Sequence, residues 1–507
     1  QPMGLVLGRH RLWPDLAAKP YTIFSGPEQV LYQSFHLGLS DISVSDILIG
    51  DTPITTYSGV TTEFAVGRLS LVDGNIDTTP GGDLDLGGAW VTRTSPADAL
   101  YLHVDLQGRQ FAVESDGDAA FSTSVLEIQY RPVGGTWSSS HTITVGSRTQ
   151  AVLRRSWAVD VPQGQYEVRV RWSSFSDGSD NADSLATKDW SFAQLLSRQP
   201  NPADYSDQRR LGVRIRASGQ LQGALDTLSC IASARCEVWN GSAWVTQESS
   251  NPAWWFRWFA NGATDASGRR LYGCLLEDSD LDLDAIKEWG AWCDANGLTI
   301  DWVVQERMTA WDVLSTIAER GRGRVTWASG KLGVVWDAPA AVTQSFNMAN
   351  IIAGSFAVHY VSGPIADEVV ASFINPTLGW RADSVRVQSD GVTQPQRPAD
   401  LRLTGVTSPE LAIREARLQA ARQRYHRRRV SWTADMEGLG CTVGDVVTVA
   451  HDATQWAASG RFVAHASGDA STLYLDREVT FSLGSTHYVQ VRRPDRTIEV
   501  AEVVYAA

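Results

Sequence analysis

The sequence has few cysteines, a shortage of positive charge and no long apolar run, and each shortage excludes a class of protein. Among 507 residues, 44 Lys and Arg oppose 57 Asp and Glu, giving a net charge of −13. A general nucleic-acid surface needs clustered cations that neutralise phosphates, so this balance argues against one. No stretch approaches the roughly 18 to 20 consecutive apolar residues of a membrane helix, and the opening "QPMGLVLGRHRLWP" lacks the apolar core of a signal peptide. We therefore expect neither a membrane anchor nor a secretion signal in this sequence.

The cysteines give no sign of a metal site. They are Cys230, Cys236, Cys274, Cys293 and Cys441, and they form no C-x-x-C pair and no zinc-type spacing. Cys230 and Cys236 could approach across a turn and form a disulfide. Buried free thiols are the commoner state in a large chain, and both alternatives stay open.

Catalytic motifs are also missing from the sequence. It contains no G-x-S-x-G elbow, no H-E-x-x-H, no P-loop and no Rossmann glycine pattern. The nine histidines are dispersed, and no two lie three or four apart on a predicted helix; examples are His10, His36, His103, His359 and His465. We therefore expect a protein that is not an enzyme, with no catalytic, cofactor-binding or metal-binding residues and no cofactor.

One acidic run imitates a calcium loop. Asp278, Asp280 and Asp282 in "EDSDLDLD" have the spacing of its first ligands. Leu283 and Trp289 stand at the sixth and twelfth positions, where such a loop requires Gly and Glu. The run is therefore interpreted as negative charge at the start of a helix, which the helix dipole favours.

Glycine, tryptophan and alternating strand patterns are plentiful. With 43% hydrophobic residues, 43 Gly and 20 Trp, the composition favours strands and turns over long helices. A length of 507 residues predicts three or four domains at roughly 150 residues each. We expect a multidomain, β-rich α+β protein that can bury sizeable cores.

The first 200 residues have the pattern of two β-rich parts. Strand-like segments between turns fill residues 20–75, and the Gly- and Asp-rich stretch 73–88 predicts a long surface loop. Alternating strands over 99–198 have sandwich-like spacing, so we expect an immunoglobulin-like insertion there. In "YEVRVRW", the residues Tyr166, Val168, Val170 and Trp172 alternate with charged ones, which predicts one buried face.

The stretch from 211 to 260 combines several signals. A strand is expected at 211–217 and a short helix at 220–232, followed by a hairpin turned at Asn240-Gly241. The aromatic run Trp254, Trp255, Phe256, Trp258 and Phe259 requires a partner surface. Such a set could form a carbohydrate platform, but Trp in β-rich proteins more often fills cores and interfaces.

Three helices have clear start and stop signals. The first lies at 282–297, with Asp residues in its first turn and Gly297 as its C-cap. The second, at 309–321, has Thr309 as cap, Asp312 in the capping-box position, Gly321 as its end, and an apolar stripe. A hairpin at 323–337 follows. The third, at 408–429, has Ser408 as cap, and Leu411, Leu418 and Tyr425 recur every seven residues.

One basic cluster lies in "RQRYHRRR", from Arg422 to Arg429. It could contact phosphates, but it lies at the C-terminal end of a predicted helix. There the dipole favours cations, which commonly remain solvated or pair with carboxylates of a neighbouring subunit. The structural interpretation is therefore preferred.

The order of these motifs resembles a known family. The sequence contains "NPAWWFRWFANG", the aspartate-capped helix, "TAWDVLSTIAERG" with its hairpin, and "NPTLGW" at 375–380. Together they resemble the J-type tail-tip, or host-specificity, proteins of lambda-like phages. The matching positions are Asn251, Pro252, Ala253, Trp254, Asp312, Val313 and Leu314, with Gly444 and Asp445 at a later turn.

The resemblance implies a domain order built on two tube-like β hub domains. The first hub domain covers 1–98 and returns at 199–250 with a connecting hairpin, around the insertion at 99–198. A small α+β domain at 251–345, a second ring-forming hub domain at 346–450 and a β-rich C-terminal domain at 451–507 follow.

The resemblance also implies a function and partners. The chain would be the structural central hub of a phage tail tip, a homotrimer that lets genomic DNA pass through its lumen without specific binding. Its partners would be tail-tube or distal tail proteins, other tail-tip proteins and the tape-measure protein. A host receptor would be contacted mainly by regions beyond this chain. The protein would be assembled in the bacterial cytoplasm and would reside in the virion. The alternative is a secreted glycan-binding protein or glycoside hydrolase with β-sandwich modules.

Overall fold

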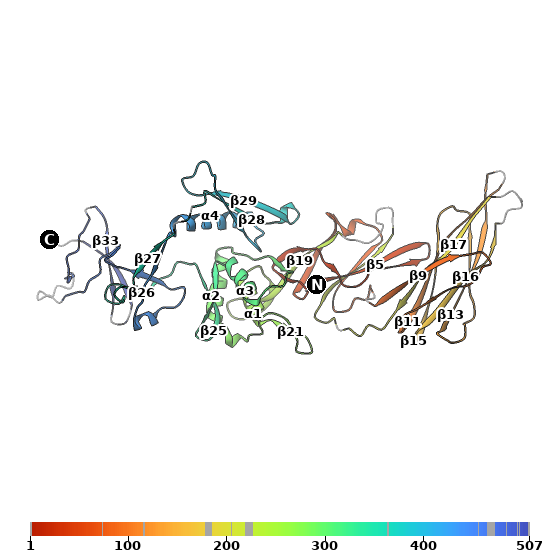
Figure 1. Ribbon diagram of the computed structural model, residues 1–507, viewed down its shortest axis with the longest axis horizontal. Helices are drawn as coiled ribbons and strands as arrows, with labels where there is room; N and C mark the ends of the chain where they lie inside the picture. The colour runs from red at the N-terminus through yellow and green to blue at the C-terminus, as the bar shows by residue number, and fades with distance from the viewer. Residues whose placement is uncertain are drawn as a thin grey trace. The chain divides into compact units, whose positions relative to one another are not determined.

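The structure is a computed structural model in which sheets predominate (Figure 1). It describes residues 3–72, 75–114, 117–177, 185–203, 205–217, 227–361, 363, 365–454, 456–463, 472–482, 484–493, 495 and 497–504. The expectation of a β-rich chain is confirmed, and the strands form many separate sheets. The chain divides into two compact units, one of residues 1–235 with 303–307 and one of residues 236–302 with 308–507. No helix in the described ranges is long and apolar enough to cross a membrane.

The first unit contains two small antiparallel sheets. Each combines strands from the beginning of the unit with one strand from its end. Their strands are β2 (Arg9–Leu12), β3 (Asp15–Leu16), β4 (Tyr21–Ser25), β5 (Glu28–Gly38), β6 (Asp41–Ile49), β7 (Thr52–Pro53), β8 (Val60–Val66), β18 (Arg209–Arg216) and β19 (Leu228–Trp239). Strand β18 pairs with β5 and β8, while β19 pairs with β2 and β6. A short pair joins β1 (Leu5–Leu7) and β23 (Trp302–Val304). The segments before residue 67 and after residue 208 therefore share their sheets.

The segment between β8 and β18 leaves these two sheets and returns to them at the same place. The amide of Gly67 donates to the carbonyl of Gln208 at 2.9 Å, directly beyond the last β8–β18 pair, Val66 with Arg209. Further along, the amide of Gln199 donates to the carbonyl of Asn75 at 3.0 Å. The two ends of the intervening segment therefore lie side by side.

This segment is a two-layer β-sandwich. One sheet contains β9 (Ile76–Leu84), β11 (Ala99–Val113), β12 (Ala119–Ala120), β15 (Leu153–Gly164) and β17 (Leu185–Arg198); the other contains β10 (Val91–Thr94), β13 (Ser122–Pro132), β14 (His141–Ser147) and β16 (Tyr166–Ser176). Inward side chains of both sheets form one core, including the predicted inner face of β16, Tyr166, Val168, Val170 and Trp172. That prediction is confirmed.

The long loop predicted at 73–88 is wrong over most of its length. Residues 76–84 form β9, which pairs with β17 at an edge of the sheet. An edge strand tolerates Pro80, because the proline removes no ladder bond from a second neighbour. Gly81 fits because a Cβ there would lie 1.7 Å from the carbonyl oxygen of Phe192. The glycines therefore serve close strand packing, which a loop-like composition conceals.

The short helix predicted at 220–232 is also wrong where the structure describes it. Residues 228–232 begin β19, and residues 218–226 lie outside the described residues. Pairing with strands on both sides gives β19 its backbone partners and overrides a weak local helix preference. The hairpin from β19 to β20 (Trp244–Glu248) is confirmed, but of its two turn residues only Gly241 has a positive φ, 99°. The Asn240 side chain instead accepts hydrogen bonds from the amides of Ser242 and Ala243 at 2.9 Å each.

The second unit begins with three helices and a hairpin. These are α1 (Pro252–Asn261), α2 (Leu283–Ala295), α3 (Ala310–Arg320), β24 (Gly323–Ala328) and β25 (Lys331–Trp336), with β21 (Ala263–Thr264) paired to β22 (Arg270–Tyr272). The helices predicted at 282–297 and 309–321 are confirmed as α2 and α3, and the hairpin predicted at 323–337 is confirmed as β24 and β25. Thr309 caps α3 by accepting the amide hydrogen of Asp312 at 3.1 Å. At the end of α2, Asn296 is the cap residue and Gly297 follows with a φ of 56°.

The remaining strands form several small sheets, one of which packs against a long helix. They are β26 (Val342–Phe346) with β32 (Val446–Val449), β27 (Ala357–Tyr360) with β31 (Arg428–Ser431), and β28 (Glu368–Asn375) between β29 (Arg381–Gln388) and β30 (Pro398–Arg402). Near the end, β33 (His487–Arg492) pairs with β34 (Ile498–Val503). The helix is α4 (Pro409–Tyr425), which packs against β28 and β29 (Figure 1).

Helix α4 begins as predicted but ends early. Ser408 accepts the amide hydrogen of Leu411 at 3.3 Å, whereas the helix stops at Tyr425 instead of residue 429. Residues 428–431 pair with β27, so sheet bonds replace helical ones. Of the residues seven apart, Leu411 is buried, Leu418 is partly exposed and Tyr425 is exposed. The buried face consists mainly of Ala412, Ala416 and Ala420, which let the helix lie close to the sheet.

Candidate functional sites and assembly surfaces

The described residues contain no group of three or more His, Cys, Asp or Glu side chains that could hold a metal ion. Among the histidines singled out in the sequence, His465 lies outside the described residues. The pKa of His36 lies below its usual value, chiefly because of burial. His359 is exposed on β27, and His103 is buried in the sandwich.

His103 belongs to a polar chain along strand β11. Its Nε2 lies 2.9 Å from Oδ1 of the fully buried Asp105, and its Nδ1 lies 3.2 Å from the hydroxyl of Tyr101. Burial raises the pKa of Tyr101, so this hydroxyl is a poor nucleophile at neutral pH. Asp105 also accepts the amide hydrogen of Phe24 at 3.0 Å and a hydrogen from the Gln194 amide group at 2.7 Å. The network therefore links the sandwich to β4, and it lacks an activated nucleophile.

All five cysteines are free. Cys230 and Cys236 lie on the same strand, β19, so their Cα atoms are roughly 20 Å apart at about 3.3 Å per residue. A disulfide requires less than about 7 Å, and the proposed approach across a turn is therefore wrong. Burial raises the pKa of both thiols to about 12, which leaves them protonated and unreactive at neutral pH.

The acidic run at 277–282 divides between two structural roles. Asp282 is the N-cap of α2, as the sequence predicts, and accepts the amide hydrogen of Ala285 at 3.3 Å. Asp278 instead accepts two hydrogen bonds from Arg257 of α1, at 2.9 and 2.7 Å. Arg257 also donates to Glu237 at 2.7 Å, and its guanidinium lies over the ring of Trp244 at 3.9 Å. The run therefore joins helices and does not converge on a cation site.

The aromatic run finds its partner surface within the chain. Trp254, Trp255, Phe256 and Phe259 are buried on α1. Phe256 meets Trp289 of α2 edge-on at 6.0 Å, and Trp254 meets Trp244 of β20 edge-on at 5.7 Å. The interpretation as core is confirmed for these residues.

The basic cluster at 422–429 pairs within its own chain. Arg422 donates to Asp337 at 2.5 Å, and Arg424 donates to the carbonyl of Asp390. Arg427 donates to the carbonyl of Val361 at 2.9 Å. The structural interpretation is supported, with intrachain partners where a neighbouring subunit was expected.

A ladder of cations and indoles on the outer face of the sandwich is a feature that the sequence pattern did not reveal. Arg131 and Arg169 lie 4.2 and 3.9 Å from the ring of Trp137, and Arg169 and Arg171 lie 4.4 and 4.5 Å from the ring of Trp90. Each such contact contributes about 0.5 to 1 kcal/mol at an exposed site. Each indole thus lies against two arginines of the sandwich, and these contacts hold the rings on the sheet.

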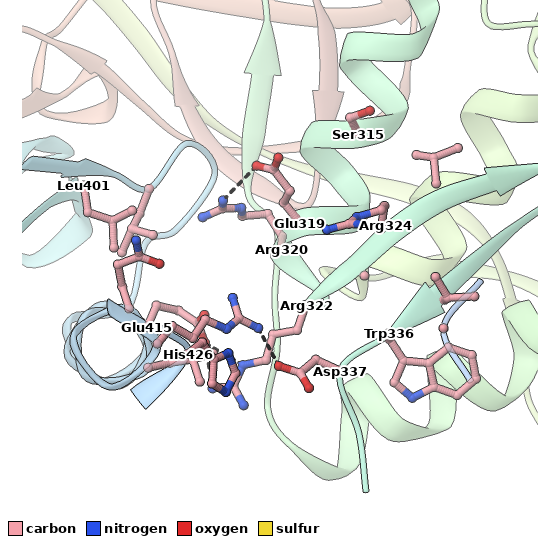
Figure 2. Close-up of a pocket in the computed structure, with 18 of the residues that line it drawn as sticks. Ser315, Glu319, Arg320, Arg322, Arg324, Trp336, Asp337, Leu401, Glu415 and His426 are labelled. Atoms are coloured by element: carbon pink, nitrogen blue, oxygen red, sulfur yellow. Dashed lines mark hydrogen bonds and ion pairs between the residues drawn. The ribbon is translucent and has the colours of Figure 1, made fainter. Parts of the chain in front are cut away.

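A charged cavity of about 740 Å³ lies between the end of α3, the β24–β25 hairpin and α4 (Figure 2). Arginines and carboxylates line it together with leucine side chains. Arg322 donates to Glu415 through two nitrogens at 3.0 and 2.8 Å. Arg320 differs from Arg322, because its Nε is buried and has no hydrogen-bond partner. No local pattern predicts this cavity, since its walls come from segments nearly 100 residues apart.

An exposed apolar surface lies beside the small sheets at 342–449. Met436 and Leu439 in the short 3-10 helix Met436–Gly440 are 78% and 83% exposed, and Val443 is 65% exposed. The parallel pair β26–β32 and the antiparallel pair β27–β31 each contain only two strands in the described part of the chain. Two-stranded sheets are marginal in water, and open edges and clustered apolar side chains favour association. We call Met436, Leu439 and Val443 the 436–443 surface.

Two sequence families match the chain. Residues 309–462 match the family described as "Putative phage tail protein", and residues 75–189 match the family described as "Tip attachment protein J, FNIII-A domain". The first match includes α3, the cavity and the 436–443 surface. The second coincides with most of the sandwich.

Individual relatives are distant. Tip attachment protein J of Escherichia phage SECphi27 is 20% identical over 457 residues, which cover 81% of this chain and 37% of that protein. The chain thus spans little more than a third of that relative's length. Among solved structures, a chain of the native gene transfer agent virion is 12% identical, with 89% of this chain and 78% of that chain covered, at a TM-score of 0.33. A structure described as "CBM4 structure and function" is 11% identical and covers 36% of this chain and 95% of that chain, at a TM-score of 0.15. Neither score is high enough to bear on the fold.

Proposed function

The chain belongs to the lambda J-type family of phage tail-tip proteins, and from this we propose that it is the structural central hub of the tail tip. Three copies form a ring that joins the sixfold tail tube to a threefold distal tip. Two ring-forming domains per chain give the ring its pseudo-sixfold symmetry: residues 1–98 with 199–250, apart from the sandwich strands β9 and β10, and residues 346–450. The sandwich is an immunoglobulin-like module carried by the first of them.

The observation that carries the proposal is the position of the 436–443 surface. It lies within residues 309–462, the part that matches the phage tail family, and beside sheets with only two strands. A second copy placed there would cover Met436, Leu439 and Val443 and give the open strand edges neighbours. In a closed ring every such edge is paired with a neighbouring copy, whereas a filament leaves an unpaired interface at each end. This favours cyclic symmetry over a filament.

The charge of the chain is compatible with a DNA passage. Each copy carries a net charge of −13, so a ring of three is strongly negative. A negative lumen repels phosphates, so that DNA passes without specific binding. Partners of the hub are tail-tube or distal tail proteins, other tail-tip proteins and the tape-measure protein.

The hub has a structural role and is not an enzyme. The polar groups described above serve caps, helix contacts and sheet contacts. It is assembled in the bacterial cytoplasm and resides in the virion.

Two measurements test the proposal. Mass photometry of the purified chain should give the mass of three copies, and cryo-EM of intact particles should place residues 346–450 around a threefold axis. A monomer that remains monomeric at high concentration, or those residues far from any threefold axis, would contradict it. Release of reducing sugars from a polysaccharide would instead favour a secreted glycoside hydrolase.

A further inference from the structure

The cavity beside α3 has one largely buried cation, Arg320, that is held by a single long ion pair. The side chain of Arg320 is 10% exposed, and its Nε has no hydrogen-bond partner. Its one ion pair is long, 3.5 Å from Nη2 to a carboxylate oxygen of Glu319, which is itself largely exposed. Burial lowers the pKa of Arg320 more than the nearby carboxylates raise it, yet a guanidinium remains charged at neutral pH.

Two other arginines of the cavity are better paired than Arg320, and the remaining one, Arg324, is exposed to solvent. Arg322 is satisfied by Glu415, and Arg422 by Asp337 at 2.5 Å. Figure 2 shows Arg320 directed toward the side of the cavity where Leu401 lies and away from Asp337, with its ion pair to Glu319 as a dashed line. The cavity therefore offers one largely buried and weakly paired guanidinium beside an apolar wall.

We propose that this cavity binds an acidic side chain of an extended peptide segment from a partner protein, with its carboxylate on Arg320. A carboxylate matches the planar guanidinium and would accept hydrogen bonds from its Nη groups, whose one partner within the chain is the distant Glu319 carboxylate. The volume of about 740 Å³ lies in the range that holds a ligand larger than one amino acid. Leu401, Leu403 and Leu418 provide an apolar wall for the residues that flank the acidic one.

The same walls disfavour a phosphate. Glu319, Asp337 and Glu415 also line the cavity, and they repel a doubly charged anion more than a singly charged one. A carboxylate on an aliphatic stem carries one charge and places methylenes against the leucines. That the partner is another tail protein rests on the proposed function, whereas carboxylate binding does not.

The test uses the full chain and two fluorescein-labelled blocked peptides, Gly-Leu-Glu-Leu-Gly and its Gln counterpart, in fluorescence polarisation. The Glu peptide should bind about tenfold more tightly than the Gln peptide, as expected for charge-assisted hydrogen bonds to a buried guanidinium. Arg320→Met should abolish this difference. Arg417→Met removes the same charge from an exposed position of α4 outside the cavity and should preserve it.

A second readout separates binding from folding. Arg320→Met removes a poorly paired buried charge, so its melting temperature should equal or exceed that of the wild type. Equal binding of the two peptides, absence of binding at millimolar concentration, or an unchanged preference in Arg320→Met would each overturn the proposal. Displacement of the Glu peptide by inorganic phosphate more readily than by acetate would also overturn it. These outcomes do not depend on the number of copies in the assembly, so a monomeric chain would contradict the hub without affecting this result.

Discussion

At the scale of single residues, Asn251 joins the start of α1 to the middle of α2. Its Oδ1 accepts the amide hydrogen of Ala253 at 2.9 Å, and its Nδ2 donates to the carbonyl of Gly290 at 2.8 Å and to Asp294 at 2.7 Å. Asn251→Asp removes both donated bonds and places a second carboxylate beside Asp294. We expect a loss of about 3 kcal/mol in the free energy of unfolding of this unit, measured by urea denaturation with tryptophan fluorescence.

Asn347→Asp is the matched control for this substitution. The Asn347 side chain accepts the amide hydrogen of Ala349 at 2.8 Å, a role that a carboxylate also fills. Its stability should change by less than about 0.5 kcal/mol. If both substitutions lower the free energy of unfolding by the same amount, the hydrogen bonds that Asn251 donates do not contribute the expected stability.

A second residue-scale prediction concerns acid. The hydrogen bonds from Arg257 hold the pKa of Asp278 below its usual value. A lowered folded pKa contributes stability that is present above the unfolded value of about 3.9 and is lost as pH falls through the folded pKa. The wild type should therefore lose stability below about pH 4, and Asp278→Asn should lose less over the same interval from a lower starting point.

Denaturant midpoints of the two proteins between neutral and acidic pH measure this difference. Other carboxylates titrate in both proteins, so their contribution cancels. Parallel curves for wild type and Asp278→Asn would show that the Arg257–Asp278 pair has no pH-dependent role.

At the scale of elements, the contact between α1 and α2 depends on a residue without a side chain. A Cβ on Gly290 would lie 2.2 Å from Cη2 of Trp254, in the interior of a helix. Alanine normally stabilises such a position by about 1 kcal/mol relative to glycine, whereas overpacking costs about 1 to 3 kcal/mol. Gly290→Ala should therefore lower the melting temperature. Glu288→Ala, on the exposed face of α2, should leave it nearly unchanged, and a stabilised Gly290→Ala would refute the close contact.

The elements also differ in how far their sequence predicts them. Helices α2, α3 and α4 follow from their caps at Asp282, Thr309 and Ser408, since a capping side chain needs only a local partner. Strands β9 and β19 do not follow from local pattern, because their pairing partners lie 100 residues or more away or on two different strands. Gly81 is informative only once Phe192 is known to lie against it.

The candidate sites obey the same division. The sequence predicts the core role of Trp254 because five aromatic residues in six positions need a common partner surface. It gives no sign of the ladder around Arg169 or of the cavity at Arg320, because both are assembled from separate segments. Helix α4 is predictable only in part. Its start follows from a local cap, whereas its end depends on the pairing of residues 428–431 with a distant strand.

At the scale of the whole molecule, the proposed trimer depends on the 436–443 surface. Leu439→Glu places a charge on a side chain that is 83% exposed in the single chain, so the fold itself should be unaffected. If that side chain is buried between copies, the charge is desolvated and the trimer should dissociate to monomers. Mass photometry measures the change, and thermal unfolding checks the fold.

Val133→Glu is the control, because Val133 is an exposed apolar residue of the sandwich, outside the proposed ring domains. It should remain trimeric. A trimeric Leu439→Glu protein together with a monomeric Val133→Glu protein would move the interface to the sandwich.

The adjacent ends of the sandwich have a genetic consequence. Asn75 and Gln199 face each other across one hydrogen bond, and the core between them is self-contained. Recombination with crossovers at these two codons would exchange the whole module and leave the strand order of its host domain intact. The sandwich can therefore act as a cassette, which a lineage can replace, lose or diversify while it inherits the rest of the chain unchanged.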